Sequence, residues 1–182
     1  PSQYGHFRVR WFDDNNLALI KGDIDPTTPV MVRLHSECFT GDVLGSLRCD
    51  CGPQLHEAMR RIEKNGSGII IYLRQEGRGI GLANKLRAYH LQEHGYDTVE
   101  ANEKLGFAPD ERQYDQAIAI LHQLGITKIN LLTNNPDKIA QLQLGDIEIN
   151  ERIPLEIAPN NYDENYLITK KNKFHHLLNL EA

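Results

Sequence analysis

Short runs of alternating or continuous apolar residues recur along the chain and predict strands. The runs GIIIYL (68–73) and KINLLT (128–133) are short and rich in β-branched residues, which is typical of buried strands. With the alternating runs added, the predicted strands cover residues 6–12, 17–22, 29–35, 68–73, 128–133 and 146–157.

Amphipathic segments lie between these runs and predict helices. Leu82, Leu86 and Tyr89 recur at helical spacing on one face, and Asn65-Gly66 supplies a stop for an earlier helix. The predicted helices cover residues 54–66, 82–95 and 114–125, and a short one begins at Pro136 with Asn135 as its N-cap.

The order of these elements predicts an α+β fold. Strands alternate with helices in the middle of the chain, which favours parallel pairing there, whereas the first forty residues are rich in strands. We therefore expect one mixed α/β domain, covering residues 1–182, with a β-rich N-terminal part and central strand–helix units.

Composition and charge restrict the function. The chain has 40% hydrophobic residues but no run of eighteen apolar ones, so we expect no membrane span and, without an apolar signal segment, a cytoplasmic location. A formal net charge of −5 argues against nucleic acid as a partner. Between Arg74 and Arg87, however, four basic residues accompany the single acid Glu76, which favours a small anionic ligand.

The three cysteines of the chain, Cys38, Cys49 and Cys51, fall within fourteen positions with the spacing C-x10-C-x-C. They could be buried thiols or a disulfide with one spare thiol, but a cytosolic chain favours metal binding. Three thiolates suit zinc and leave a fourth position for water, which gives a hydrolytic site. A closed structural site, with His35 or His56 as the fourth ligand, is the alternative.

A zinc nucleobase deaminase is a second interpretation of the same region. His35-Ser36-Glu37 matches the H-x-E half of the deaminase signature. The second half requires P-C-x-x-C, whereas this chain has C-x-C without the proline, so the match is incomplete.

Two segments have the composition of phosphate-binding loops. RQEGRGIGLANK (74–85) leaves a predicted strand through glycines, carries two arginines and enters a helix, whose N-terminal amides favour an anion. LLTNNPDK (131–138) repeats the arrangement, with a strand end, an N-cap and a lysine in the first helical turn. The glycines alone could form only a tight turn, and the arginines shift the interpretation toward phosphate.

Seven segments resemble, in order, the GTP cyclohydrolase II family, the first committed enzyme of riboflavin synthesis. They are RLHSEC, GSLRCDCG, RQEGRGIGL, NKLRAY, DTVEAN, LGFAPDER and LLTNNPDK, and the match continues into ERIPL. The resemblance runs from about Arg33 to Leu155, and the first thirty residues and the tail after residue 160 add little to it.

The resemblance implies an α+β homodimer that converts GTP and water into formate, pyrophosphate and a diaminopyrimidinone ribosyl phosphate. It implies that the three cysteines hold one Zn²⁺ per chain and that the water bound to this zinc attacks C8 of guanine. It also implies that Mg²⁺ binds with the triphosphate. Tyr89 matches the family's active-site tyrosine, Asp110 the proposed proton acceptor and Arg112 the proposed nucleophile toward the α-phosphate. The implied GTP contacts are Arg33, Leu34, His35, Ser36, Glu37, Gln54, Glu76, Gly77, Arg78, Thr98, Thr133 and Lys138.

Four of these residues also have plainer interpretations. Asp110 with Gln113 could cap the following helix, and Tyr89 could be a core residue. Arg112 could stabilise charge rather than attack, because a guanidinium is protonated at neutral pH. Glu76 could read the N1 and N2 donors of guanine, or it could be a charge paired with Arg74 or Arg78.

Overall fold

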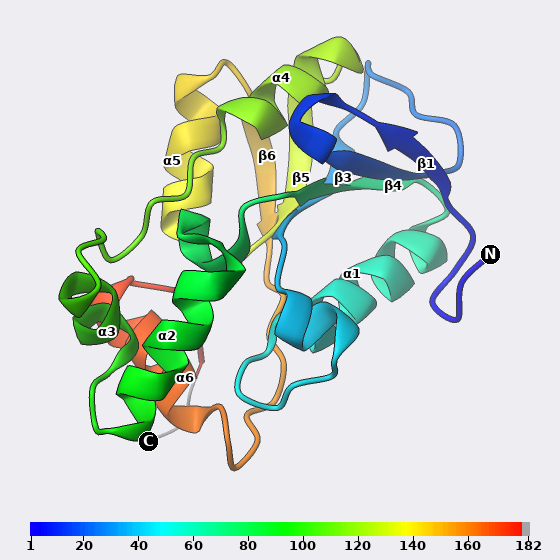
Figure 1. Cartoon of the computed structure of the whole chain (residues 1–182). Helices are drawn as coiled ribbons and strands as arrows, with labels where there is room; N and C mark the ends of the chain where they lie inside the picture. Colours follow the sequence, from blue (N-terminus) through cyan, green and yellow to red (C-terminus); the bar gives the residue numbers. More distant parts are fainter. Residues whose placement is uncertain (180–182) are drawn as a thin grey trace.

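The computed structural model describes residues 1–179, and within them a single mixed sheet has six strands in the order β1-β2-β4-β3-β5-β6 (Figure 1). Two pairings, β1 with β2 and β2 with β4, are antiparallel, whereas β3 runs parallel to both β4 and β5, and β5 runs parallel to β6. The strands are β1 (Arg8–Trp11), β2 (Leu17–Lys21), β3 (Val30–Ser36), β4 (Gly68–Leu73), β5 (Lys128–Leu132) and β6 (Glu148–Ile153). The α+β fold with central parallel pairing is confirmed.

The α-helices are α1 (Cys51–Asn65), α2 (Gly81–Glu93), α3 (Thr98–Lys104), α4 (Asp115–Gln123), α5 (Pro136–Leu144) and α6 (Glu164–Lys173). The predicted ends are confirmed where capping chemistry is strong: Gly66 closes α1 with φ +83°, and the Asn135 side chain accepts the Asp137 N–H at 2.9 Å. Helix α1 begins three residues earlier than predicted, at Cys51 itself, and α3 and α6 were not predicted.

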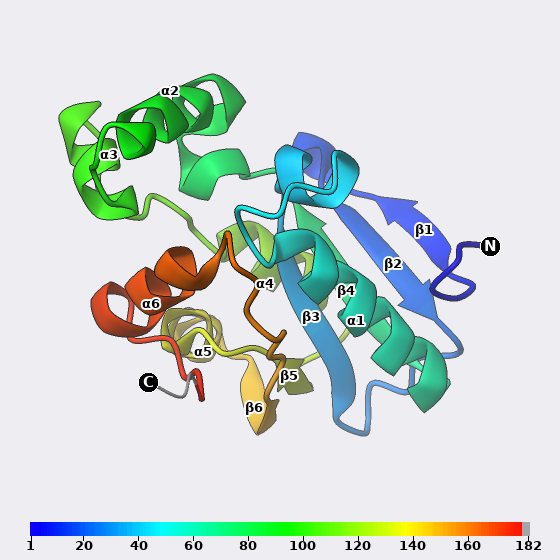
Figure 2. The same ribbon diagram turned by 90° about the horizontal axis from the view of Figure 1, so that it is seen from below.

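Helices cover both faces of the sheet, with α1 on one face and α4 and α5 on the other (Figures 1 and 2). The alternation along β4 shows how its sequence supports this layering: Ile70 packs with the α1 residues Ala58 and Ile62, while Ile69 and Ile71 pack in the cluster of α4 and α5. A strand that is apolar on both sides must be covered on both sides, which accounts for the run GIIIYL.

The remaining helices α2, α3 and α6 lie beyond one edge of the sheet (Figure 2). This is the edge where the parallel strands β3, β4 and β5 end, so the loops that follow them come together there. In open sheets, ligands bind outside the carboxyl ends of parallel strands. The fold therefore places the predicted cysteine loop and both predicted phosphate loops on one side of the molecule.

The apolar face predicted for α2 is wrong at one position. Leu86 is 50% exposed, whereas Lys85 and Ala88 are the buried residues of the helix. The reason is that α2 faces a polar cavity rather than the core, so its inward side carries a charged residue. Among the residues that the structure describes, no helix is both long and apolar enough to cross a membrane.

The packing of β4 yields a stability prediction. Ile71 is fully buried at the centre of the sheet, and Ile71→Ala should lower the free energy of unfolding by about 2–5 kcal/mol through lost burial and a residual cavity. Val9→Ala, at a position that is 64% exposed, should change it by about 0.5 kcal/mol or less. Denaturant unfolding of both variants measures the difference, and equal effects would contradict the assigned core.

Candidate active site

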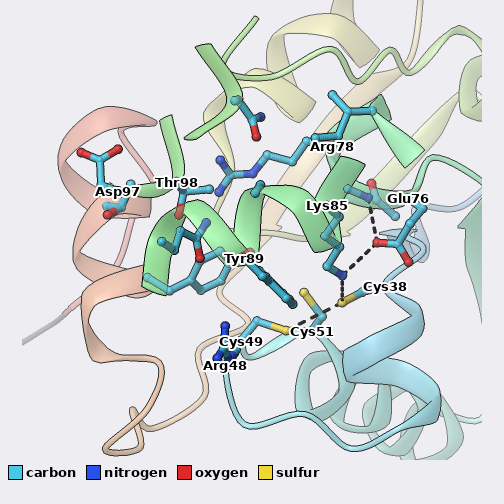
Figure 3. Close-up of a pocket in the computed structure, with 18 of the residues that line it drawn as sticks. Cys38, Arg48, Cys49, Cys51, Glu76, Arg78, Lys85, Tyr89, Asp97 and Thr98 are labelled. Carbon is cyan, nitrogen blue, oxygen red and sulfur yellow. Dashed lines mark hydrogen bonds and ion pairs between the residues drawn. The ribbon is translucent and has the colours of Figure 1, made fainter. Parts of the chain in front are cut away.

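A cavity of about 420 Å³ lies between the strand ends and helices α2, α3 and α6. Figure 3 shows the cysteines, Lys85 and Tyr89 converging at one end of it and Arg78 lying toward the other. Of the residues singled out from the sequence, those that line the cavity are Ser36, Glu37, Cys38, Cys49, Cys51, Glu76, Gly77, Arg78, Tyr89, Thr98 and Arg112.

The three cysteine sulfurs form a compact donor set. All three Sγ atoms lie within 4.8 Å of one another, and those of Cys38 and Cys49 are 3.7 Å apart. A tetrahedral zinc with Zn–S bonds of about 2.3 Å separates its sulfurs by about 3.8 Å, so the spacing fits zinc. Within residues 1–179, no histidine or carboxylate joins this group, which leaves a three-ligand set rather than a closed four-ligand one.

Glycines hold the backbone close beneath the sulfurs. Residues Phe39–Val43 form one π-helical turn, and a Cβ on Gly41 would lie only 3.1 Å from the sulfurs of both Cys38 and Cys49. A Cβ on Gly52, in the first turn of α1, would collide with the carbonyl oxygen of Gly41. The turn and the helix can therefore meet only where neither carries a side chain.

A buried carboxylate supports the first cysteine from behind. Asp42 accepts the Cys38 N–H at 3.0 Å and the Tyr72 hydroxyl at 2.8 Å, and its other neighbour is His35 Nε2 at 3.0 Å. Burial lowers the pKa of His35 despite Asp42. His35 thus faces Asp42 and His56 stacks on Tyr4, so neither histidine acts as the fourth ligand and the H-x-E match has no deaminase geometry.

The pKa values of the cysteine thiols are shifted in different directions. Hydrogen bonds from Cys49 and Cys51, followed by the charge of Lys85, outweigh burial and lower the pKa of Cys38. The hydrogen bond to Cys38 is also the first cause that raises the pKa of Cys49 to about 11. A divalent cation that replaced these sulfur–sulfur hydrogen bonds would favour the thiolate at all three positions.

Tyr89 lies beside the cysteines. Its hydroxyl is 3.3 Å from Thr40 Oγ1, which is itself 3.7 Å from Cys38 Sγ, and Arg48 lies over its ring at 5.2 Å. Burial is the first cause that raises the pKa of Tyr89, so the phenol stays protonated at neutral pH. Tyr89 is thus a cavity-lining residue rather than part of the core.

Two buried cations, Arg33 on β3 and Lys138 in the first turn of α5, lie behind the cavity. Arg33 donates to the Leu132 carbonyl at 2.9 Å and to Gln54 at 2.5 Å, and Lys138 donates to the Leu34 carbonyl at 2.8 Å. Burial and then the charges of Arg33 and Arg112 lower the pKa of Lys138. Thr133 is also buried, with its hydroxyl accepting the Asn135 N–H at 3.0 Å. These predicted contacts are therefore near the cavity but do not line it.

This group of cations has few counter-charges. Arg33 Nε and Arg78 Nη1 are buried with no hydrogen-bond partner among the described residues, and Lys138 has only a carbonyl acceptor. Burying cations without matched acceptors is unfavourable, because each loses its hydration. A bound polyanion would supply the missing acceptors.

Asp110 and Arg112 form a local pair at the cavity wall. The Arg112 guanidinium donates to both oxygens of Asp110, with Nε 2.9 Å from Oδ1. Burial alone would raise the pKa of Asp110, but Arg112 outweighs it and lowers that pKa. Helix α4 begins five residues later with Tyr114 at its N-cap position, so the interpretation of Asp110 as a helix cap is wrong.

Glu76 has a different partner from either one considered. Lys85 Nζ donates to it at 2.9 Å, and the backbone N–H groups of Gly77 and Phe39 donate at 2.7 and 2.5 Å. Arg74 instead pairs with Glu37 at 2.9 Å. Guanine reading by Glu76 stays a prediction, and a guanine edge would have to replace at least one of these internal donors.

Helix α6 supplies a wall that the sequence analysis missed. Its residues Asn165, Tyr166 and Thr169 line the cavity, as does Tyr162 just before it. The ring of Phe174, which follows the helix, lies 4.2 Å from the Arg78 guanidinium. The tail after residue 160 carries no clear amphipathic pattern from which this helix could have been predicted.

Two ion pairs fasten α6 in place. Lys170 donates to Asp50 at 2.5 Å, and both side chains are almost fully buried. Lys173 pairs with Asp97, the residue that caps α3. Because Asp50 lies between Cys49 and Cys51, the tail helix is tied directly to the cysteine loop.

Sequence comparison accounts for this combination of features. The sequence profile described as GTP cyclohydrolase II matches residues 1–154. The chain belongs to the GTP cyclohydrolase II family. Members of this family are enzymes. The matched region contains the three cysteines, the two loops that follow β4 and β5, and the Asp110–Arg112 pair.

Individual relatives agree with the profile. The chain is 56% identical over 185 residues to riboflavin biosynthesis protein RibBA of Bacillus cereus (strain B4264), and 55% identical to the protein of the same name from Bacillus mycoides (strain KBAB4). Each alignment covers 99% of this chain and 47% of the relative. The chain therefore spans about half the length of these relatives.

The Lys170–Asp50 pair yields a second stability prediction. Lys170→Met should lower the free energy of unfolding by about 3–5 kcal/mol, because it leaves the Asp50 carboxylate buried without its cation. The control is Lys64→Met, which removes a lysine charge at an exposed position of α1 and should leave the unfolding midpoint nearly unchanged. Denaturant unfolding compares them, and an unperturbed Lys170 variant would show that α6 is not fastened in this way.

Proposed function

We propose that this chain hydrolyses GTP, opening the imidazole ring of guanine and releasing formate and pyrophosphate. The organic product would be 2,5-diamino-6-(5-phosphoribosylamino)pyrimidin-4(3H)-one, as the first step of riboflavin biosynthesis. The observation that carries the proposal is one cavity with three thiols at one end and arginines at the other. Family membership and the printed name of the relatives support it.

The thiol end suits hydrolysis at guanine C8. Cys38, Cys49 and Cys51 would hold one zinc ion, which would supply an acidified water for the hydrolysis. Opening the ring and releasing formate breaks two C–N bonds at C8 and consumes one water for each. Tyr89, protonated and beside the sulfurs, would donate a hydrogen bond to the purine during these steps.

The cationic end suits the triphosphate. Arg78 and Arg112 line the cavity, and the buried Arg33 and Lys138 lie behind it, where they donate to neutral oxygen acceptors. Phosphate oxygens are the acceptors that such guanidinium groups lack, and Mg²⁺ would accompany the triphosphate. The GTP contacts implied by the resemblance, including Leu34, Gln54, Thr98 and Thr133, remain part of the proposal.

Arg112 is better suited to stabilising charge than to covalent attack. Burial by itself would lower the pKa of Arg112, but Tyr114 and Asp110 outweigh it and raise that pKa. A guanidinium that holds its proton more firmly is a poorer nucleophile and a better electrostatic partner for the α-phosphate. Asp110, ionised at neutral pH, would orient Arg112 and accept a proton from the water that attacks the α-phosphate.

The larger biological setting is part of the same proposal. We expect residues 1–182 to act as one catalytic domain that works as a homodimer in the cytoplasm, without nucleic acid or membrane partners. The decisive assay is incubation with GTP and Mg²⁺, with formate and pyrophosphate measured separately. Ammonia without formate would instead support a deaminase, and bound zinc without any product would support a binding module.

The metal assignment predicts the effect of removing one sulfur. Cys49→Ser should lose the metal and formate release together, because two thiolates bind zinc much more weakly than three. Metal content by atomic absorption and formate by a coupled assay measure both, with circular dichroism to verify the fold. A variant that keeps a full equivalent of zinc would overturn the assignment.

The phosphate end predicts a separable defect. Arg112→Ala should reduce pyrophosphate release by about 10²–10³-fold, because it removes a preorganised cation from the developing charge. Arg87→Ala, an exposed arginine on α2, removes the same charge away from the cavity and should leave the rate unchanged. Near-normal pyrophosphate release by the Arg112 variant would exclude this residue from the mechanism.

A further inference from the structure

Lys85 is a buried cation that nothing in the proposed reaction uses. It lies in the second turn of α2 and is only 9% exposed. Its Nζ donates to Cys38 Sγ at 3.0 Å and to Glu76 Oε1 at 2.9 Å (Figure 3). The ammonium group therefore lies directly against one of the three sulfurs.

The orientation of Lys85 is fixed by its neighbours. Glu76 is itself buried, and both of its oxygens are occupied: Gly77 N–H donates to Oε1 at 2.7 Å and Phe39 N–H donates to Oε2 at 2.5 Å. The carboxylate is thus held by two backbone amides and in turn holds the ammonium. Phe39 follows Cys38 directly, so the same contact also fixes the backbone beside the sulfur.

We propose that Lys85 is a positioning residue for the metal held by Cys38, Cys49 and Cys51. It would donate a hydrogen bond to the Cys38 thiolate and so limit the negative charge that this sulfur gives to the metal. This inference rests on the proposed function, because it takes the three sulfurs as the ligands of its zinc.

Charge arithmetic explains why such a donor matters. Three thiolates and one divalent cation leave a net charge of −1, and a strongly donating thiolate set makes the metal a weaker Lewis acid. Lys85 and Glu76 are neutral as a pair, so their effect is directional: the positive end of the pair faces the sulfur. Glu76 also offsets the cost of burying the ammonium when the sulfur is not charged.

The contact is of the kind that tunes metal sites elsewhere. Groups that hydrogen-bond a metal ligand orient it and set its donor strength, and their removal commonly costs 10–100-fold in metal affinity. Among the described residues, no other lysine or arginine donates to a cysteine sulfur. Lys85 is therefore the cationic hydrogen-bond donor that the described part of the chain provides for the cysteine sulfurs.

The experiment compares two variants that both lack the Glu76 charge. Glu76→Gln keeps the side-chain shape, an acceptor oxygen and the Lys85 ammonium, whereas the double variant Glu76→Gln/Lys85→Met also removes the ammonium. Lys85→Met alone would leave a buried carboxylate without a cation and could unfold the chain, so the double variant is the informative one. Arg87→Met is the control for losing a cation from the exposed side of α2.

Two readouts need no GTP. Zn²⁺ affinity is measured by chelator competition on protein shown to be folded, and the sulfur-to-metal charge-transfer band is recorded on the Co²⁺-loaded protein. The double variant should bind Zn²⁺ about 10–100-fold more weakly than Glu76→Gln, because the buried three-thiolate site, with its net charge of −1, loses the cation that stabilises it and orients the Cys38 sulfur. Its band should shift to longer wavelength, because a thiolate without its donor gives up electrons more easily.

The outcomes separate this inference from the proposed function. If the two variants agree within two-fold in affinity and show the same band, Lys85 has no role at the metal and the inference is overturned. Parent protein that binds Zn²⁺ but leaves GTP intact would refute the proposed function while the comparison of variants still stands. The Arg87 control should match the parent in both readouts.

Discussion

The parallel pairing of β3 with β4 and β5 is the constraint on which the rest of the structure depends. Strands that run parallel end at the same edge, so the segments after Ser36, Leu73 and Leu132 meet even though they are far apart in the sequence. Each of those segments carries one part of the chemistry: thiols, the glycine–arginine loop, and the threonine–lysine loop. The connecting helices pack on the two sheet faces and leave this edge free for α2, α3 and α6 (Figure 2).

Much of the fold was predictable because its strands are locally distinctive. The β-branched runs at 68–73 and 128–133 and the Asn135-Pro136 cap each carry their own signal, and the structure contains all of them. Helix α6 had no comparable signal, since it is mostly polar and is held by two long-range ion pairs. Lys173 pairs with Asp97, which is 76 positions away in the sequence, and Lys170 pairs with Asp50, which is 120 positions away. Pairings of that range depend on the assembled fold and leave no local pattern.

The same distinction applies to the site. The cysteine spacing and the glycine–arginine loop indicated their chemistry because few other roles suit those residue types. Lys85 was visible only as one positive charge in a basic segment, and its partner proved to be Glu76 across the loop. The interpretation of Leu86 as buried failed for a related reason: helical spacing identifies a face, but only the surroundings decide whether core or cavity lies beneath it.

The tie between Lys170 and Asp50 also has a consequence for the order in which the protein is made. The two residues are 120 positions apart, which a ribosome adding about 5–20 residues per second covers in about 6–24 s. The cysteines and α1 (Cys51–Asn65) are complete early in that interval, whereas the wall made by α6 (Glu164–Lys173) is not. The nascent chain thus passes through a stage in which the cysteine loop lacks the cover that α6 later provides.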